Sequence, residues 1–326
     1  MFHKNFFTFT AHDNADLGFQ MGKVFTAQAR TGIQRARRHK NWSAKRVRAQ
    51  KFLVFQTQYF PEYSEELQAY AKGAHVDFLD LFTLSLEDEV EDRLTEHCTT
   101  VITDDGFLLA HNEDENEISE DQICVVQKTI EALTLFELYY YNTLGGNSVT
   151  VNSHGFVIAI NSLSSKALQV GVPRNAIARF FSETNDPERA LAKLDVLPRG
   201  AGYSINIVNA KQEVWNIEYN SKSVSVTRPT LPFVHTNHHL SHLKADEANL
   251  GESSRNRYRM ASKLVRAQMT PMSLFGLMAD TSNGAEISLT NRHTVARIIV
   301  EPAAAQIWLK RERLSGALTY PLTLLK

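Results

Sequence analysis

The sequence has few cysteines and no long apolar run, and each absence excludes a class of protein. Cys98 and Cys124 are the only cysteines among 326 residues, which excludes a disulfide framework and favours a reducing cytoplasm as the location. No apolar run approaches the roughly 18 residues that span a bilayer. Residues 1–10 also lack the apolar core and small-residue cleavage site of a signal peptide. We therefore expect a cytoplasmic protein with no membrane partner.

An excess of positive charge is also missing. The chain has 35 Lys and Arg residues against 36 Asp and Glu residues, and its formal net charge is -1. Proteins that bind nucleic acid or anionic lipid usually carry a marked basic excess. The composition therefore gives no reason to expect a nucleic-acid partner.

The pattern of apolar residues changes near residue 97. Before it, apolar residues recur every three or four positions, which predicts helices near 17–25, 61–74 and 79–90. The first repeat consists of Leu17, Met21, Val24 and Phe25. After residue 97, short β-rich segments separated by turns predominate, and further helices are predicted at 175–183, 187–194, 253–269 and 271–279. Short turns between strands favour antiparallel pairing over a doubly wound parallel sheet. We predict an α+β fold in which two antiparallel sheets pack together beneath helices.

Cys98 lies at the point where this pattern changes. The commonest role of a free cysteine is that of a small buried residue, but the first position of a strand after a polar loop is unusual for one. The next strand follows a turn at Asp105-Gly106 and ends in the segment His111-Asn112-Glu113-Asp114. A hairpin would bring these polar residues back toward Cys98. The same acidic residues would also suit a solvated turn, so the pattern alone leaves both interpretations open.

Several motifs together resemble one family. The sequence Cys98-Thr99-Thr100, followed by Gly106 and Asn112-x-Asp114, resembles the nucleophile region of the isopenicillin N acyltransferase-like branch of the N-terminal-nucleophile hydrolases. Other matching elements occur in the family's order over about residues 15 to 310. They are Leu17-Gly18-Phe19-Gln20-Met21-Gly22, Asn152-x-x-Gly155-Phe156, Asn161-Ser162-Leu163, Gly171-x-Pro173 with Arg179, Thr236-Asn237-His238 and Ser254-x-x-Arg257.

The resemblance implies a fold, a processing step and roles for particular residues. The fold would be a four-layer αββα sandwich, and the precursor would cut itself between His97 and Cys98. The helical segment 1–97 would stay bound as the small subunit on the catalytic core 98–326, and together they would form one structural domain. Cys98 would be the nucleophile, Asp114 would orient or polarise the site, Asn237 would donate to the oxyanion, and Arg292 would lie beside the nucleophile. The substrate would contact Thr100, Asn112, Asn161, Ser162 and His238.

The chemistry follows from placing an amine and a thiol on one residue. A free thiol with a pKa of about 8.5 needs an activator near neutral pH. An α-amine freed on Cys98 would have a pKa of about 7.7 to 8.0 and could accept the thiol proton. Attack on a linear amide or thioester would form an acyl-enzyme. Water would then hydrolyse it, or an amine would accept its acyl group. We expect no cofactor and no metal. Glycine usually precedes the nucleophile in this family, and His97 is a departure from that pattern.

Two alternatives remain open from the sequence. One is a cysteine hydrolase that is not cut and uses His97, His111 or His238 as its base. The other is a catalytically inactive member of the fold that serves in binding. A zinc site at His238 and His242, which have helical spacing, is disfavoured because no HExxH motif accompanies them.

Overall fold

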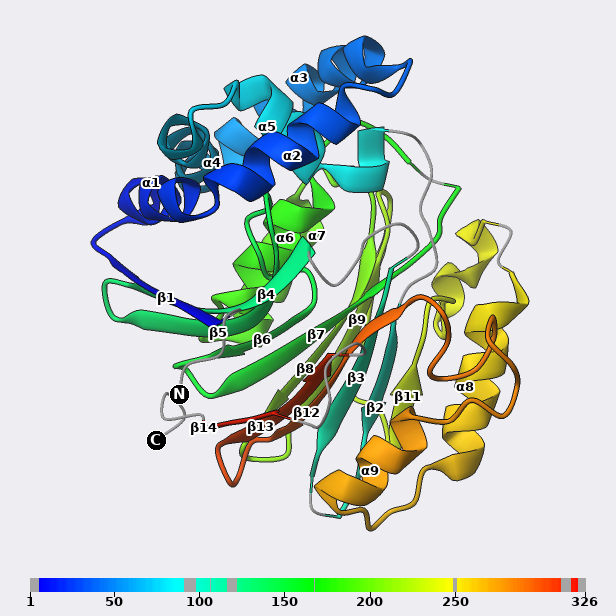
Figure 1. The fold of residues 1–326 in the computed structure, drawn as a ribbon. Helices are drawn as coiled ribbons and strands as arrows, with labels where there is room; N and C mark the ends of the chain where they lie inside the picture. Colours follow the sequence, from blue (N-terminus) through cyan, green and yellow to red (C-terminus); the bar gives the residue numbers. More distant parts are fainter. Residues whose placement is uncertain are drawn as a thin grey trace.

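The protein is a stack of two β-sheets with helices on both outer faces (Figure 1). The computed structural model describes residues 6–90, 98–105, 107–115, 122–166, 168–248, 251–311 and 318–321. The predicted cleavage-site residue His97 therefore lies outside the described residues. The four layers are helices, an eight-stranded sheet, a six-stranded sheet and a second set of helices.

The first helical layer comes largely from the N-terminal third of the chain. Its helices are α1 (Asn14–Val24), α2 (Thr26–Ala36), α3 (Trp42–Tyr59), α4 (Pro61–Ala74), α5 (Phe78–Ser85), the short 3₁₀ helix η1 (Glu87–Val90), α6 (Arg174–Ser182) and α7 (Pro187–Val196). The predicted repeat on α1 buries Leu17 and Met21 and continues to buried Phe25, whereas Val24 is exposed. Gly18 lets α1 contact α4 closely, because a Cβ atom there would lie 2.0 Å from the carbonyl oxygen of Glu66.

The larger sheet has the strand order β1-β4-β5-β6-β7-β8-β9-β10. Its strands are β1 (Phe6–Ala11), β4 (Ile123–Ile130), β5 (Leu133–Tyr140), β6 (Val149–Asn152), β7 (Phe156–Ser162), β8 (Tyr203–Asn209), β9 (Val214–Tyr219) and β10 (Val224–Thr227). The pairs are antiparallel except β1 and β4, which are parallel. The prediction of two antiparallel sheets is corrected at this one pair. A parallel pair needs a long connection, and here more than a hundred residues separate the two strands.

The smaller sheet has the order β11-β2-β3-β12-β13-β14. Its strands are β2 (Thr99–Ile102), β3 (Leu109–Asp114), β11 (Phe233–His235), β12 (Thr294–Glu301), β13 (Gln306–Arg311) and β14 (Leu318–Pro321). Its outer face is covered by α8 (Glu252–Leu264) and α9 (Pro271–Met278) (Figure 1).

Separate apolar cores fill the spaces between these layers. Between the two sheets, residues such as Val157 and Val208 of the larger sheet pack against Leu109 and Ile298 of the smaller one. Two further clusters join the N-terminal helices to the larger sheet, and a fourth joins α8 and α9 to the smaller sheet. The αββα arrangement therefore follows from burial of both faces of both sheets.

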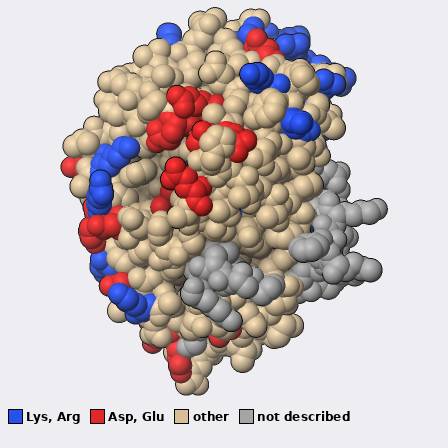
Figure 2. Space-filling model, turned by 90° about the vertical axis from the view of Figure 1, so that its left-hand side faces the viewer, with Lys and Arg blue, Asp and Glu red and all other residues tan. Residues whose placement is uncertain are grey.

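Charged side chains on the surface are of both signs. On the face shown in Figure 2, acidic side chains gather in the upper half, whereas Lys and Arg lie at the upper right and along the left edge. Within the described part of the chain, no helix combines the length and apolar character needed to cross a bilayer.

Candidate active site

A hairpin brings Cys98 to the polar end of β3. Strands β2 and β3 are antiparallel, with Thr99 opposite Asn112 and Thr100 opposite His111, and the thiol of Cys98, just before β2, forms a hydrogen bond with Glu113. This confirms the predicted hairpin. Strand β3 includes the whole polar segment His111–Asp114, and both ends of that segment are buried. The segment is therefore not a solvated turn.

Alternation along the two strands divides the polar side chains between two faces. Leu109 belongs to the core between the sheets and Ala110 to the core beneath α8 and α9. His111 and Glu113 consequently point between the sheets, whereas Asn112 and Asp114 point toward the second helical layer. The site is therefore built on both faces of one hairpin.

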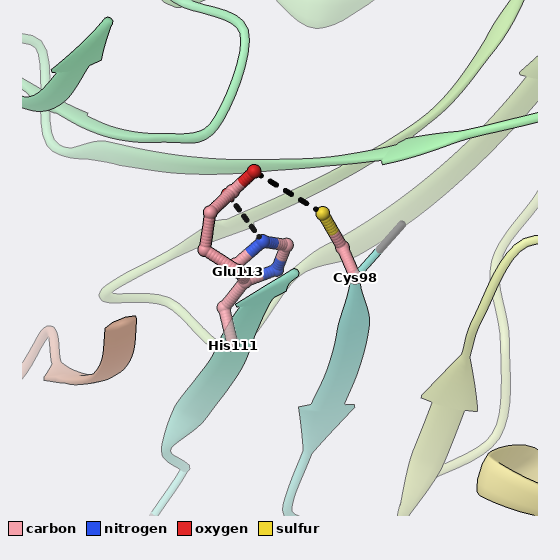
Figure 3. A group of neighbouring side chains, drawn as sticks. All are labelled: Cys98, His111 and Glu113. Carbon is pink, nitrogen blue, oxygen red and sulfur yellow. Dashed lines mark hydrogen bonds and ion pairs between the residues drawn. The ribbon is translucent and has the colours of Figure 1, made fainter. Parts of the chain in front are cut away.

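The sulfur of Cys98 lies in the space between the sheets. It donates a hydrogen bond to Oε1 of Glu113 at 3.3 Å, and only 4% of the residue is exposed (Figure 3). Burial raises the pKa of the thiol well above its ordinary value, and the negative charges of Glu113 and Asp114 raise it further. The thiol is therefore protonated near neutral pH.

Glu113 is surrounded by hydrogen-bond donors. Its Oε1 accepts from the thiol and from the hydroxyl of Tyr140 at 2.6 Å. Its Oε2 contacts Nε2 of His111 at 3.1 Å and accepts from the hydroxyl of Ser148. Burial raises the pKa of Glu113, but His111, Ser148 and Tyr140 together outweigh this and leave it below the ordinary value. The carboxylate is thus ionised with all four of its acceptor positions used.

The contacts of His111 determine where its protons lie. The hydroxyl of Thr100 donates its single hydrogen to Oδ1 of Asn161 at 2.8 Å, so it can only accept from Nδ1 of His111, 2.9 Å away. The orientation of Asn161 is set in turn by Asn206, whose Nδ2 donates to the same Oδ1. Nδ1 of His111 is therefore a donor. Nε2 of His111 lies 3.1 Å from Oε2 of the ionised Glu113, so both ring nitrogens have a hydrogen-bond partner (Figure 3).

On the other face, Arg257 of α8 holds the backbone of Cys98. Its Nη1 donates to the carbonyl oxygen of Cys98 at 2.6 Å and to Oγ1 of Thr99 at 2.8 Å, and its Nη2 donates to Oδ1 of Asn237 at 2.6 Å. Nδ2 of Asn237 donates to the carbonyl oxygen of Ser162 at 3.0 Å. The planar guanidinium thus links the predicted nucleophile to the predicted oxyanion donor.

Asp114 lies beside this link. Its carboxylate accepts from Oγ1 of Thr294 at 2.5 Å and from Nδ2 of Asn291 at 3.2 Å, and it lies 3.9 Å from Nη1 of Arg257. Burial raises the pKa of Asp114, although the charge of Arg257 opposes the rise. The carboxylate of Asp114 therefore lies beside the arginine, whereas the backbone of Asp114 forms a hydrogen bond with the thiol of Cys98.

The structure brings most of the predicted site residues together. Cys98, Thr100, Asn161, Asp114, Ser162 and Asn237 belong to the two connected networks. Asn112 lies on the outer face, where its Nδ2 donates to the carbonyl oxygens of Met278 and Leu289. His238 contacts Ser254 and Thr236, and burial lowers its pKa to about 4.

The structure does not place Arg292 beside the nucleophile. Its side chain is 63% exposed and pairs with Glu286 at 3.0 Å. The arginine in contact with Cys98 is Arg257. The motif Ser254-x-x-Arg257 was among the matching elements of the sequence, but the role of Arg257 followed only from its contact with Cys98.

Glu113 is the main site residue that the sequence did not assign. The signal that could have identified it is the hairpin register, since Glu113 follows Asn112, the partner of Thr99, just as Cys98 precedes Thr99. Tyr140 and Ser148 come from the larger sheet and the loop before β6, and nothing in the sequence linked them to Cys98.

One group in the described residues has the donors of a metal site. One ligand atom each from Cys98, His111 and Glu113 lies within 4.8 Å of the others. These three groups are already bonded to one another, because the thiol donates to Glu113 and Nε2 of His111 lies 3.1 Å from the same carboxylate. His238 and His242 do not share one helix, because the 3₁₀ helix η3 (His242–Asp246) begins only at His242.

Comparison with known proteins identifies the family. The family described as acyl-coenzyme A:6-aminopenicillanic acid acyl-transferase matches residues 101–313, which is more than half of the chain, and the chain belongs to this family. The resemblance in the sequence is thereby confirmed at the level of the family.

One curated relative and two solved structures are similar to the chain. The beta-alanyl-dopamine/carcinine hydrolase of Drosophila melanogaster is 30% identical over 188 residues, which are 49% of this chain and 48% of that protein. The chain thus spans about half the length of this relative. A mutant conjugated bile acid hydrolase from Clostridium perfringens has a TM-score of 0.48 at 9% identity, and covers 69% of this chain and 92% of its own. Penicillin V acylase from Agrobacterium tumefaciens has a TM-score of 0.47 at 12% identity, and covers 69% and 86%.

Proposed function

We propose that the protein is a self-processing cysteine amidohydrolase or acyltransferase that forms an acyl-enzyme on Cys98. The observation that carries the proposal is the position of Cys98. Its sulfur faces an ionised carboxylate, and its carbonyl oxygen is held by an arginine that also fixes an amide side chain. A core cysteine kept only for packing would not need these polar partners.

The backbone at Cys98 supports cleavage on its N-terminal side. Its φ is 82°, a left-handed value that a residue with a Cβ atom adopts at a cost of about 1 to 3 kcal/mol. This torsion exists only while Cys98 is joined to the preceding residue. Cutting the bond before Cys98 would remove the constraint and release the strain. Self-cleavage is thus favoured by the conformation of the uncut chain.

After cleavage, the new α-amine of Cys98 serves as the base for turnover. It takes the thiol proton while the sulfur attacks the substrate carbonyl, and it returns the proton to the leaving nitrogen. The amide nitrogen of Asn237 has two hydrogens, and the bond to Ser162 uses one. We assign the second to the oxyanion of the tetrahedral intermediate. Arg257 positions this donor relative to Cys98.

We propose linear amides with a short acyl group, including β-alanyl amides, as the substrate class. Support comes from the hydrolase of D. melanogaster that is 30% identical over half of this chain and whose name specifies β-alanyl-dopamine. The free thiols of Cys98 and Cys124 suit a reducing compartment such as the cytoplasm. The 1–97 fragment would stay bound, because its helices share two apolar clusters with the larger sheet.

Mass spectrometry combined with an amide screen tests the proposal. The wild-type protein should consist of two chains, the second beginning at Cys98, and should release amine from β-alanyl amides. Cys98→Ala should remain one folded chain and be inactive. A fully active wild-type protein that stays intact would favour an uncut cysteine hydrolase. Two chains without activity on any acyl amide or thioester would favour a binding role.

A further inference from the structure

Self-cleavage needs a base for the thiol proton other than the one proposed for turnover. Before the cut, the nitrogen of residue 98 belongs to a peptide bond and is not basic. The α-amine that would serve as base in turnover therefore does not yet exist. The thiol must nevertheless lose its proton to attack the carbonyl carbon of residue 97. A different group must take the proton in this first step.

We propose that Glu113 is the general base for self-cleavage and that His111 positions its carboxylate for this step. The inference rests on the self-processing function proposed above. Within the described residues, Glu113 is the one titratable side chain to which the thiol donates a hydrogen bond, at 3.3 Å. Both the carboxylate and the sulfur point into the space between the sheets (Figure 3). The geometry thus meets the first requirement for a base.

The proton and electron balance of the step is complete within the chain and one water. The thiol proton moves to Oε1 of Glu113 while the sulfur forms a bond to the carbonyl carbon of residue 97. The C–N bond before Cys98 then breaks, and Glu113 returns the proton to the leaving nitrogen, which becomes the α-amine. The resulting thioester is hydrolysed by water, which restores the thiol, leaves a carboxylate on residue 97 and gives its remaining proton to the new α-amine. Glu113 ends in its starting state.

The position of His111 favours the transfer in a buried site. Moving the proton neutralises Glu113 and leaves a thiolate, which a polar group beside the buried sulfur would stabilise. A ring nitrogen of His111 lies within 4.8 Å of the sulfur, and Nε2 lies 3.1 Å from Oε2 of Glu113. Nδ1 of His111 is held by Thr100, which itself donates to Asn161. The imidazole is thus fixed beside both the carboxylate and the sulfur.

The chain contains a matched pair that lacks a thiol. Glu218 of β9 and His235 of β11 are both buried, and Nε2 of His235 lies 2.8 Å from Oε1 of Glu218. Glu218 otherwise accepts from the backbone nitrogens of Leu240 and Ser241. The variant Glu218→Gln therefore removes the charge of a similar buried carboxylate without changing the surroundings of Cys98.

The test follows the rate at which full-length precursors made by cell-free translation acquire a new N-terminus at Cys98. Glu113→Gln should slow this rate about 100-fold or more near neutral pH. The residual rate should rise about tenfold per pH unit, because hydroxide must then remove the thiol proton. Glu218→Gln should be cut like the wild type. Cleavage of Glu113→Gln at the wild-type rate and with the wild-type pH profile would overturn the inference but leave self-processing in place.

A second variant keeps the test valid if Glu113→Gln does not fold. Tyr140→Phe preserves the carboxylate but removes one of the hydrogen bonds that lower its pKa. Glu113 would then be protonated at higher pH, and the loss of self-cleavage on acidification should shift to higher pH. An unshifted profile would count against Glu113 as the base. A wild-type chain that never forms the Cys98 terminus would overturn both this inference and the proposed function.

Discussion

Arg257 and Cys98 are 159 positions apart in the sequence, and the guanidinium of one donates to the carbonyl oxygen of the other at 2.6 Å. The same guanidinium reaches Asn237, so one buried side chain sets the relative positions of the nucleophile and the proposed oxyanion donor. A planar group with five donors in a fixed arrangement is suited to this task, and a lysine is not.

Arg257→Lys should therefore impair both stability and turnover. The ammonium cannot make all three bonds, so we expect a loss of about 1 to 3 kcal/mol in the free energy of unfolding and at least about a tenfold fall in kcat. Urea denaturation and steady-state kinetics measure the two effects. Arg292→Lys is the matched control and should stay within about 0.5 kcal/mol of the wild type, because its side chain is exposed. A strong effect of Arg292→Lys on kcat would revive its sequence-based assignment.

Asn237→Ala should reduce turnover far more than stability. Losing one oxyanion donor typically costs about 2.7 to 4 kcal/mol of barrier, or roughly 100- to 1000-fold in kcat. Asn112→Ala should behave in the opposite way, because it leaves two buried carbonyl oxygens without their donor. We expect Asn112→Ala to lose about 1 to 3 kcal/mol in the free energy of unfolding and to keep the KM of the wild type. Wild-type kcat in Asn237→Ala would exclude the oxyanion role.

Asp114→Asn should slow the processing of the precursor. The change removes the negative charge 3.9 Å from Nη1 of Arg257 while keeping the size of the side chain. We expect the rate of N-terminus formation to fall by about tenfold, which corresponds to about 1.4 kcal/mol of barrier. Asp280→Asn serves as the control. It makes the same aspartate-to-asparagine change on the loop after α9, at a position distant from Asp114 in the sequence. Equal rates for both variants would reduce Asp114 to a structural residue.

His111→Gln should change the pH dependence of self-cleavage. The hydrogen bond and charge of His111 lower the pKa of Glu113, so without them that pKa rises. Glu113 is then protonated at higher pH, and the rate should begin to fall at higher pH as the solution is acidified. Rates of precursor cutting between about pH 4 and 8 show the shift. His235→Gln alters the other buried histidine–glutamate pair and should leave the profile unchanged. A profile that moves equally in both variants would point to a general loss of structure.

The sequence predicted most of the elements because their local signals agree with the final packing. Pro61 begins α4, at the start of the predicted helix 61–74, and the side chain of Asp186 caps α7. The strands β1, β11 and β14 were not predicted, because three to six residues give too weak a periodic signal. The parallel pairing of β1 with β4 depends on how the helices between them pack, which no local pattern records.

The site was predictable where it depends on one hairpin and not where distant segments meet. The turn before β3 was enough to bring Asp114 and its neighbours toward Cys98. Whether Glu113 is solvated or buried depends on Tyr140 and Ser148 of the other sheet. The arginine beside Cys98 could not be chosen from the sequence, because α8 reaches the site only through the folding of the second helical layer.

The packing of the N-terminal helices on the larger sheet has a consequence for how the cut protein would denature. Phe25 stacks on Tyr139 with ring centroids 5.9 Å apart, and this contact spans the proposed cleavage point. An uncut chain unfolds and refolds as a single molecule. A cut one would fall apart into two polypeptides, so its melting temperature would rise with protein concentration and its refolding would become second order. Heating a dilute sample would then be irreversible in practice, even though no covalent bond changes during the experiment.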